Sequence, residues 1–353
     1  GRDSIKVDVN PQINPNAGSD QFICYDSTTQ LNGSSTGGVT PYQYNWSPAG
    51  KLSSTSGASV NTANLIQNQT FTLTVTDSNN CSASNSVNVD VNNQLSVSAT
   101  VKQDTLCYND STTLQSSYSG GSDSLTVSWS PASKVQNAAA PNPSTTGLQN
   151  TTDFVLTVTD SLGCRKRDTV TITVSPDITI STEADTAICF DDSLQLNAST
   201  SGGLGSLSYQ WSPSGKVQKP KTLTPYTTSL TSDKTFTLTA TDQFSCLSKD
   251  SVQITVDTAL TANAGTDDTY CGDTLRLGGN PVASGGTRPF TYRWTPSQPM
   301  VDTTLANAGV TTLDSVTRFN VLVTDSFGCT ASDRVKVYPK PKADAGPDTT
   351  FCA

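Results

Sequence analysis

Apolar and polar residues alternate with a period of two through most of the chain. The clearest segment is residues 70–76, in which Phe71, Leu73 and Val75 share one side and threonines occupy the other. The same pattern recurs at Phe154/Leu156/Val158, Phe236/Leu238/Ala240 and Phe319/Val321/Val323. One apolar and one polar face predict β-strands of a sheet that packs against a single partner sheet.

The residues around this strand predict a hairpin and an aromatic strand. A turn at residues 77–80 is followed by a second alternating segment, residues 86–91, which predicts the returning strand of a hairpin. Upstream, residues 42–48 form an aromatic segment that ends at Pro48, where a proline stops a strand ladder. A glycine pair at residues 37–38 precedes it and predicts a turn with positive φ.

These segments recur at a period of about 82 residues. The first cysteines of the copies are Cys24, Cys107, Cys189, Cys271 and Cys352; the tryptophans are Trp46, Trp129, Trp211 and Trp294; and the second cysteines are Cys81, Cys164, Cys246 and Cys329. Each second cysteine follows its tryptophan by 35 residues. A fixed period of this length predicts a tandem array of like units.

The period divides the chain into repeat 1 (13–95), repeat 2 (96–177), repeat 3 (178–259) and repeat 4 (260–340). Residues 1–12 resemble the last strand of a preceding repeat, and residues 341–353 resemble the first strand of a following one. We expect both to pair with neighbouring sequence, along one long chain or across subunits, because natural proteins avoid open sheet edges. The ninth cysteine then reflects where the sequence is cut.

Composition excludes several classes of function. The formal net charge is −9 and there is no histidine, so the basic face that nucleic acid requires is absent from the sequence. No segment approaches the roughly 20 apolar residues of a membrane span. Two cysteines per repeat indicate disulfides and therefore an extracellular location, and a zinc site lacks the usual Cys-x-x-Cys or histidine ligands.

Short strands, frequent turns and one tryptophan per repeat predict an all-β chain of immunoglobulin-like antiparallel sandwiches of about seven strands each, arranged as an elongated rod. The motif order A-G-x-D, I-C-x-D-S, Y-x-W-S-P and T-F-T-L-T-V-T-D-S-x-x-C resembles the tandem polycystin-type (PKD-like) repeats of giant secreted surface proteins of the Bacteroidota, including gliding-motility adhesins. The resemblance covers all four repeats. It implies an extracellular adhesin, filament or stalk at the cell surface.

No residue pattern indicates catalysis, so we expect no enzyme and no catalytic residue. Four recurrent acids lie four residues before the second cysteines, at Asp77, Asp160, Asp242 and Asp325. They suit general bases or calcium ligands, but an aspartate that caps a turn through backbone amides is the favoured interpretation. The tryptophans are expected to fill the core rather than to bind sugar.

Two further groups of residues are candidate sites. Calcium at the joints between repeats would use acids ahead of the first cysteines, namely Asp20, Asp104, Asp185, Asp267 and Asp268. Otherwise no cofactor is expected. Asp-Ser and Asp-Thr triplets are similar to the O-glycan acceptor motif of the same bacteria and make candidates of Ser4, Ser27, Thr105, Ser111, Thr169, Thr186, Ser193, Ser251, Thr274 and Ser315.

Two arguments about disulfide pairing conflict. The constant separation of Cys24 and Cys81, which recurs in each repeat, suits a bond within one repeat. However, the two cysteines fall at opposite ends of the predicted sandwich, and a disulfide requires Cα atoms within about 7 Å. Bonds between successive repeats, Cys24 with Cys164, Cys107 with Cys246 and Cys189 with Cys329, avoid this conflict and are favoured. They leave Cys81 to a preceding repeat and Cys271 to a following one.

The sequence therefore predicts a non-enzymatic structural and adhesive segment of an extracellular filament or stalk. Its expected partners are neighbouring repeats or copies of itself, with host, surface or glycan ligands as further partners. One alternative is an array of glycan- or protein-binding modules, for which the basic loop 216–221 is the best candidate. Another is a spacer in a secreted hydrolase.

Overall fold

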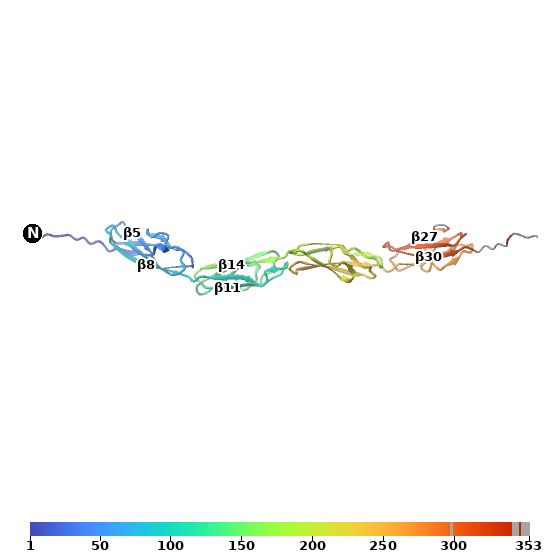
Figure 1. Cartoon of the computed structure of the whole chain (residues 1–353), viewed down its shortest axis with the longest axis horizontal. Coiled ribbons are helices and arrows are strands. Elements are labelled where there is room, and N and C mark those ends of the chain that lie inside the picture. Colours follow the sequence, from blue (N-terminus) through green and yellow to red (C-terminus); the bar gives the residue numbers. More distant parts are fainter. Residues whose placement is uncertain (297–298, 341–345, 347–353) are drawn as a thin grey trace, which may run out of the picture. The chain divides into compact units, whose positions relative to one another are not determined.

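The computed structural model describes residues 1–296, 299–340 and 346. The described residues form four all-β repeats and contain short 3-10 turns but no α-helix. None of the helices in this part of the chain has the length and apolar character needed to cross a membrane. Repeats 1 and 2 belong to one compact unit, Gly1–Pro176, and repeats 3 and 4 to a second, Asp177–Ala353. Figure 1 colours the repeats along the chain.

Repeat 1 is a sandwich of two layers. Its elements are β1 (Asn14–Asn16), β2 (Gln21–Ile23), β3 (Gln30–Asn32), β4 (Ser34–Thr36), β5 (Gln43–Ser47), η1 (Ala49–Lys51), β6 (Ser59–Asn61), β7 (Gln69–Thr76) and β8 (Ser82–Val91). One layer is a four-stranded sheet in the order β2-β8-β7-β5, and the other contains the pairs β1-β4 and β3-β6. The expected hairpin is β7-β8, with Phe71 opposite Val87.

The other repeats have the same four-stranded sheet, in the orders β10-β14-β13-β12, β16-β22-β21-β18 and β24-β30-β29-β27. Repeat 2 contains β9 (Ser96–Val101), β10 (Thr105–Leu106), β11 (Leu114–Ser119), β12 (Thr126–Ser130), η2 (Ala132–Lys134), β13 (Thr152–Thr159) and β14 (Arg165–Val174). Repeat 3 contains β15 (Thr179–Thr182), β16 (Thr186–Ile188), β17 (Ala198–Ser201), β18 (Ser208–Ser212), η3 (Ser214–Lys216), β19 (Val217–Gln218), β20 (Tyr226–Thr227), β21 (Lys234–Thr241) and β22 (Leu247–Val256). Repeat 4 contains β23 (Thr261–Ala262), β24 (Asp268–Thr269), β25 (Leu275–Arg276), β26 (Ala283–Ser284), β27 (Thr291–Thr295), β28 (Gly309–Val310), β29 (Thr317–Thr324) and β30 (Thr330–Tyr338).

The expectation of purely antiparallel sheets is wrong at one strand of each repeat. In repeat 1 the first strand is split, so that β1 pairs with β4 while β2 crosses to the other layer and pairs in parallel with β8. Gly18, with φ of +90°, lies between the two parts, and its N–H donates to Asn16 Oδ1. This turn lets one short segment close the edges of both layers, which protects them from pairing with other chains.

The core lies between the two layers. Trp46, Trp129, Trp211 and Trp294 are at most 1% exposed, as are Phe71, Phe154, Phe236 and Phe319. Trp46 satisfies its indole N–H by donating to the carbonyl of Gly57, at 3.1 Å. The tryptophans therefore act as core residues, and the pattern that predicted strands also predicted which side chains fill the sandwich.

The segments at the two ends have different outcomes. Residues 1–12 form no strand, and Ile5, Val7 and Val9 are exposed. The alternation of apolar residues that predicts a strand is present, and the pairing of this segment with neighbouring sequence stays a prediction. The predicted strand at 341–353, including Cys352, lies outside the described residues apart from Gly346.

Candidate functional site: the disulfide-bonded joints

A disulfide joins repeat 1 to repeat 2. Cys24 follows β2, Cys164 precedes β14, and their Cα atoms lie 5.6 Å apart. Repeat 4 is joined to repeat 3 in the same way by Cys189 and Cys329, whose Cα atoms also lie 5.6 Å apart. In each bond the first cysteine comes from the loop after a parallel edge strand, and the second comes from the turn of the β-hairpin in the next repeat.

These bonds exclude pairing within a repeat for the cysteines concerned. Cys81, the partner that an intradomain bond would need for Cys24, is unpaired and exposed in the structure, as is Cys271. The third bond favoured by the sequence, between Cys107 and Cys246, stays a prediction. The same holds for the pairing of Cys81 and Cys271 with further repeats.

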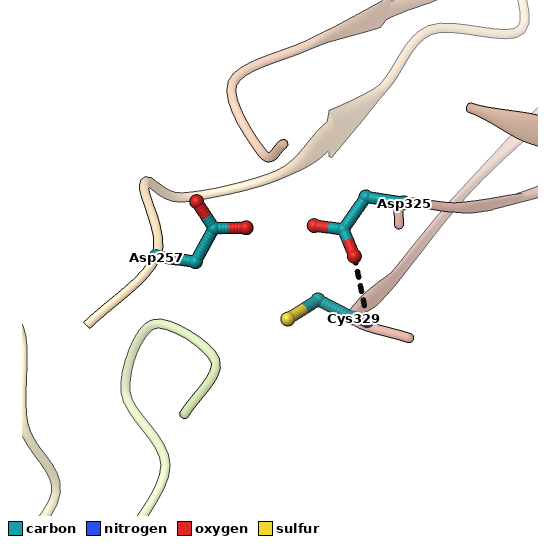
Figure 2. Close-up of side chains that lie close together, drawn as sticks. All are labelled: Asp257, Asp325 and Cys329. Carbon is teal, nitrogen blue, oxygen red and sulfur yellow. Dashed lines mark hydrogen bonds between the residues drawn. The ribbon is translucent and has the colours of Figure 1, made fainter. Parts of the chain in front are cut away.

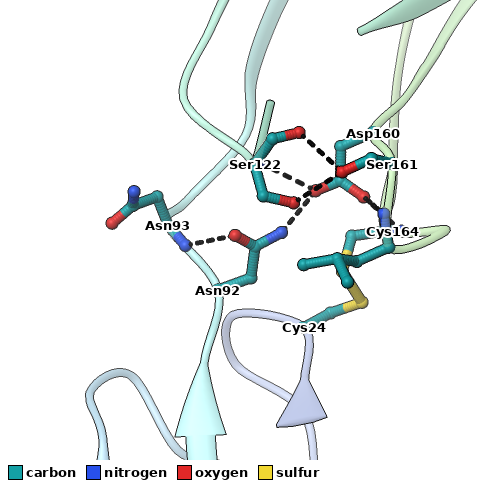
Figure 3. The surroundings of a disulfide bond; sticks show 8 residues. Cys24, Asn92, Asn93, Ser122, Asp160, Ser161 and Cys164 are labelled. Carbon is teal, nitrogen blue, oxygen red and sulfur yellow. Dashed lines mark hydrogen bonds between the residues drawn. A yellow bond between two sulfur atoms is a disulfide. The ribbon is translucent and has the colours of Figure 1, made fainter. Parts of the chain in front are cut away.

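The hairpin turn that carries the second cysteine is held by its recurrent aspartate. Asp160 Oδ1 accepts the N–H groups of Leu162, at 3.0 Å, and Cys164, at 2.9 Å. Its Oδ2 accepts the N–H of Ser122, at 3.3 Å, from the loop that follows the paired glycines. Figure 3 shows this carboxylate between the two loops. The side chain therefore caps the turn, as expected, and also positions the disulfide.

The equivalent aspartates make the same contacts in the other repeats. Asp77 accepts the N–H groups of Asn79, Cys81 and Val39, at 2.9, 3.0 and 3.0 Å. Burial opposes the ionisation of Asp77, but these three N–H donors outweigh it and lower the pKa of the carboxyl below its ordinary value. Asp242 and Asp325 bind the corresponding N–H groups of Phe244, Cys246, Phe327 and Cys329.

A second contact at the first joint comes from the residue after the last strand of repeat 1. Asn92 is 5% exposed, and its Nδ2 donates to Asp160 Oδ2 (Figure 3). Beside this contact, Cys24, Tyr25, Leu95 and Arg165 line part of a hollow of about 240 Å³. Nothing in the sequence pattern had singled out Asn92, because it lies just beyond the alternating segment.

The acids predicted to bind calcium have structural partners inside their own repeats. Oδ1 of Asp20, Asp185 and Asp267 accepts the backbone N–H of Asn88, Gln253 and Lys336, respectively, each at 2.8 Å. Asp104 accepts the hydroxyl of Thr105, and Asp268 accepts the N–H of Thr269. In three repeats these contacts hold the parallel edge strand to the last strand of the sheet. Calcium at these positions stays a prediction.

A different trio brings metal-ligand atoms together. Asp257, Asp325 and Cys329 place one such atom each within 4.8 Å of one another (Figure 2). Cys329 is bonded to Cys189, so its sulfur is not a thiolate ligand. Two carboxylates remain, fewer than the six to eight oxygens that calcium takes.

The candidate glycan acceptors are mostly accessible. Eight of the ten are exposed, and Ser27 and Thr105 are half-buried. The exposed ones are Ser4, Ser111, Thr169, Thr186, Ser193, Ser251, Thr274 and Ser315. Glycosylation at these positions stays a prediction.

The basic loop 216–221 has a structural role in repeat 3. The carbonyl of Pro220 accepts the backbone N–H of Trp211, at 2.8 Å, and Val217 is buried. In repeats 1, 2 and 4 the carbonyls of Thr55, Ala138 and Thr303 bind the equivalent tryptophan N–H groups. The loop therefore covers the core tryptophan in the same way as its counterparts in the other repeats.

Comparison with known proteins gives one family match. A family model described as a PKD domain matches residues 17–91, which lie within repeat 1. No curated protein matches the chain. The match agrees with the resemblance to polycystin-type repeats over this part of the sequence.

The chain is also similar to solved arrays of immunoglobulin domains. An I-band fragment of titin is 11% identical, with a TM-score of 0.42, over 70% of this chain and 99% of the fragment. The three N-terminal domains of the bacteriophage RB49 outer capsid protein Hoc are 12% identical, with a TM-score of 0.33, over 70% and 98%. Immunoglobulin domains 1–5 of Sidekick-1 are 12% identical, with a TM-score of 0.28, over 94% and 81%. The strand order within each repeat is what establishes the immunoglobulin-like fold here.

Proposed function

We propose that this chain is a non-enzymatic structural segment of an extracellular filament or stalk on a bacterial surface. The observation that carries the proposal is the pair of disulfides that join successive repeats instead of closing single ones. A bond within a domain stabilises that domain, whereas a bond across a joint keeps neighbouring domains attached even when one of them unfolds. Disulfides also favour an oxidising location outside the cytoplasm.

The outer surface of the sheets suits a segment exposed to water. On the polar face of the β7-β8 hairpin, the hydroxyls of Thr72 and Ser86 lie 3.1 Å apart, and those of Thr74 and Ser84 also lie 3.1 Å apart. Cross-strand hydroxyl pairs of this kind stabilise a sheet without creating an apolar patch. Adhesion to a surface, host or glycan is the part of the proposal that rests on the resemblance to Bacteroidota repeats.

Cleavage of the backbone between repeats 1 and 2 tests the covalent joint. A protease recognition sequence is inserted between Asn93 and Gln94, and the oxidised chain is cut and analysed on a denaturing gel. We expect a single full-size species without reductant, because Cys24–Cys164 spans the cut. With reductant, fragments of about a quarter and three quarters of the chain should separate.

The matched control is the same insertion in Cys24→Ser, which should separate after cleavage without any reductant. If the wild-type fragments also separate without reductant, the joint is not covalent and the proposed function loses the observation that carries it.

A further inference from the structure

The two described joints differ at one contacting residue. At the joint between repeats 1 and 2, the amide of Asn92 donates a hydrogen bond to the carboxylate of Asp160. At the joint between repeats 3 and 4, the equivalent residue after the last strand is Asp257, and it faces Asp325 (Figure 2). An ionised carboxylate only accepts hydrogen bonds, so the second joint places two acceptors where the first has a donor and an acceptor.

Most of the oxygens of this pair are committed to other donors. Asp325 is 6% exposed, and its Oδ1 accepts the N–H groups of Phe327 and Cys329, at 3.0 and 2.9 Å. Asp257 Oδ1 accepts the N–H of Thr258, at 2.7 Å, and the hydroxyl of Thr287, at 2.9 Å. Asp257 Oδ2 is buried and has no hydrogen-bond partner in the structure.

No positive charge compensates the pair within the described residues, where neither carboxylate takes part in an ion pair. Arg288 follows Thr287, but its guanidinium lies over the ring of Phe290, 5.4 Å from the centroid. The other titratable group nearby is Asp192, an acid that lines the adjoining hollow of about 290 Å³. Two ionised carboxylates this close repel each other, and binding one proton relieves the repulsion.

We propose that Asp257 and Asp325 share one proton, which makes the joint between repeats 3 and 4 a pH-sensitive contact. With the proton present, one carboxyl donates to the other and reproduces the hydrogen bond that Asn92 makes at the first joint. When the proton leaves at higher pH, the two charges repel and the joint loosens. The joint between repeats 1 and 2 lacks this response because an amide does not titrate.

The neighbours of Asp257 indicate which partner holds the charge. Burial raises the pKa of Asp257, but hydrogen bonds from the Thr287 hydroxyl, the Thr258 N–H and the Asp325 carboxyl outweigh it and lower the pKa. Asp257 is therefore the ionised acceptor, and the shared proton lies on Asp325. The stabilising effect of the ionised Asp257 is lost as the pH falls through its lowered pKa, whereas that of the shared proton is lost as the pH rises. The contact is strongest between these limits.

Hydrogen exchange of the whole oxidised chain tests the proposal without any variant. The amides of residues 325–329 and 284–287 are compared with their counterparts at 160–164 and 119–122, from about pH 5 to about pH 8, with a chelator present. The intrinsic pH dependence of exchange is common to both joints, so their ratio isolates the effect. We expect exchange at the second joint to become about tenfold faster relative to the first across this range.

Two reciprocal variants sharpen the test. Asp257→Asn makes the second joint like the first and should abolish the relative acceleration. Asn92→Asp makes the first joint like the second and should create one there. The proposal is overturned if the wild-type ratio does not change with pH, or if Asp257→Asn leaves the change intact. It is also overturned if calcium, added at about pH 8, restores protection in the wild type, because the pair is then a cation site.

Discussion

Pulled by its two ends under oxidising conditions, the chain is expected to reach only about a fifth of its full contour length. A chain of 353 residues without cross-links extends to about 1,200 Å. With Cys24–Cys164 and Cys189–Cys329 intact, the load passes only through residues 1–24, 164–189 and 329–353, and the limit falls to about 250 Å.

This expectation follows from connectivity alone. Tension that reaches Cys24 crosses the disulfide to Cys164, so the backbone between them cannot be stretched even if its sandwiches unfold. The load then follows β14, β15 and β16 to Cys189 and crosses again to Cys329. A bond between Cys107 and Cys246 would leave this shortest path unchanged.

Single-molecule force spectroscopy with handles at the two ends measures the effect. Cys24→Ser removes one crossing and should lengthen the oxidised chain by about 470 Å. Cys81→Ser, which removes an unpaired cysteine, should leave it unchanged. An oxidised wild-type chain that extends in four full-repeat steps would show that the repeats are loaded in series and that the cross-links do not carry force.

The second large effect is expected from Gly120→Ala in repeat 2. Gly120 has φ of +80°, and a Cβ there would lie 1.9 Å from the carbonyl oxygen of Gln94, in the segment that leads into the repeat. The substitution adds both left-handed strain and a clash with backbone, so we expect a loss of at least about 3 kcal/mol. Hydrogen exchange of the β13 and β14 amides reports the free energy of opening repeat 2.

Gly163→Ala is the matched control. Gly163 has nearly the same φ, +82°, but a Cβ there would meet nothing within 4 Å. It should cost only the strain of the left-handed conformation, about 1 to 2 kcal/mol. Equal losses for the two substitutions would show that the close approach of Gly120 to Gln94 does not matter for stability.

Much of the fold could be predicted from the sequence because its longest strands are periodic. The alternation at Phe71, Leu73 and Val75 identifies both the strand and its buried face, and the constant interval from Trp46 to Cys81 identifies the repeat. The short edge strand β2 could not be predicted in this way. A segment of three residues has no measurable period, and its parallel partner β8 lies more than sixty residues away.

The joints were predicted in part. Opposite ends of a sandwich cannot be bridged, and this geometric argument was enough to favour Cys24–Cys164 over Cys24–Cys81. The contact of Asn92 with Asp160 could not be foreseen, since it depends on how the chain leaves one repeat and enters the next. The position recurs as Asp257 at the other described joint, and only the structure shows that this residue meets the aspartate of the following turn.

A peptide map without reduction tests the covalent joints most directly. After free thiols are blocked, trypsin separates the cysteines into peptides 7–51 (Cys24), 52–102 (Cys81), 103–134 (Cys107), 135–165 (Cys164), 168–216 (Cys189), 235–249 (Cys246), 250–276 (Cys271) and 319–334 (Cys329). For protein made in an oxidising compartment, we predict that 7–51 is linked to 135–165 and 168–216 to 319–334. A link between 7–51 and 52–102 would place the bond inside repeat 1 and contradict the account.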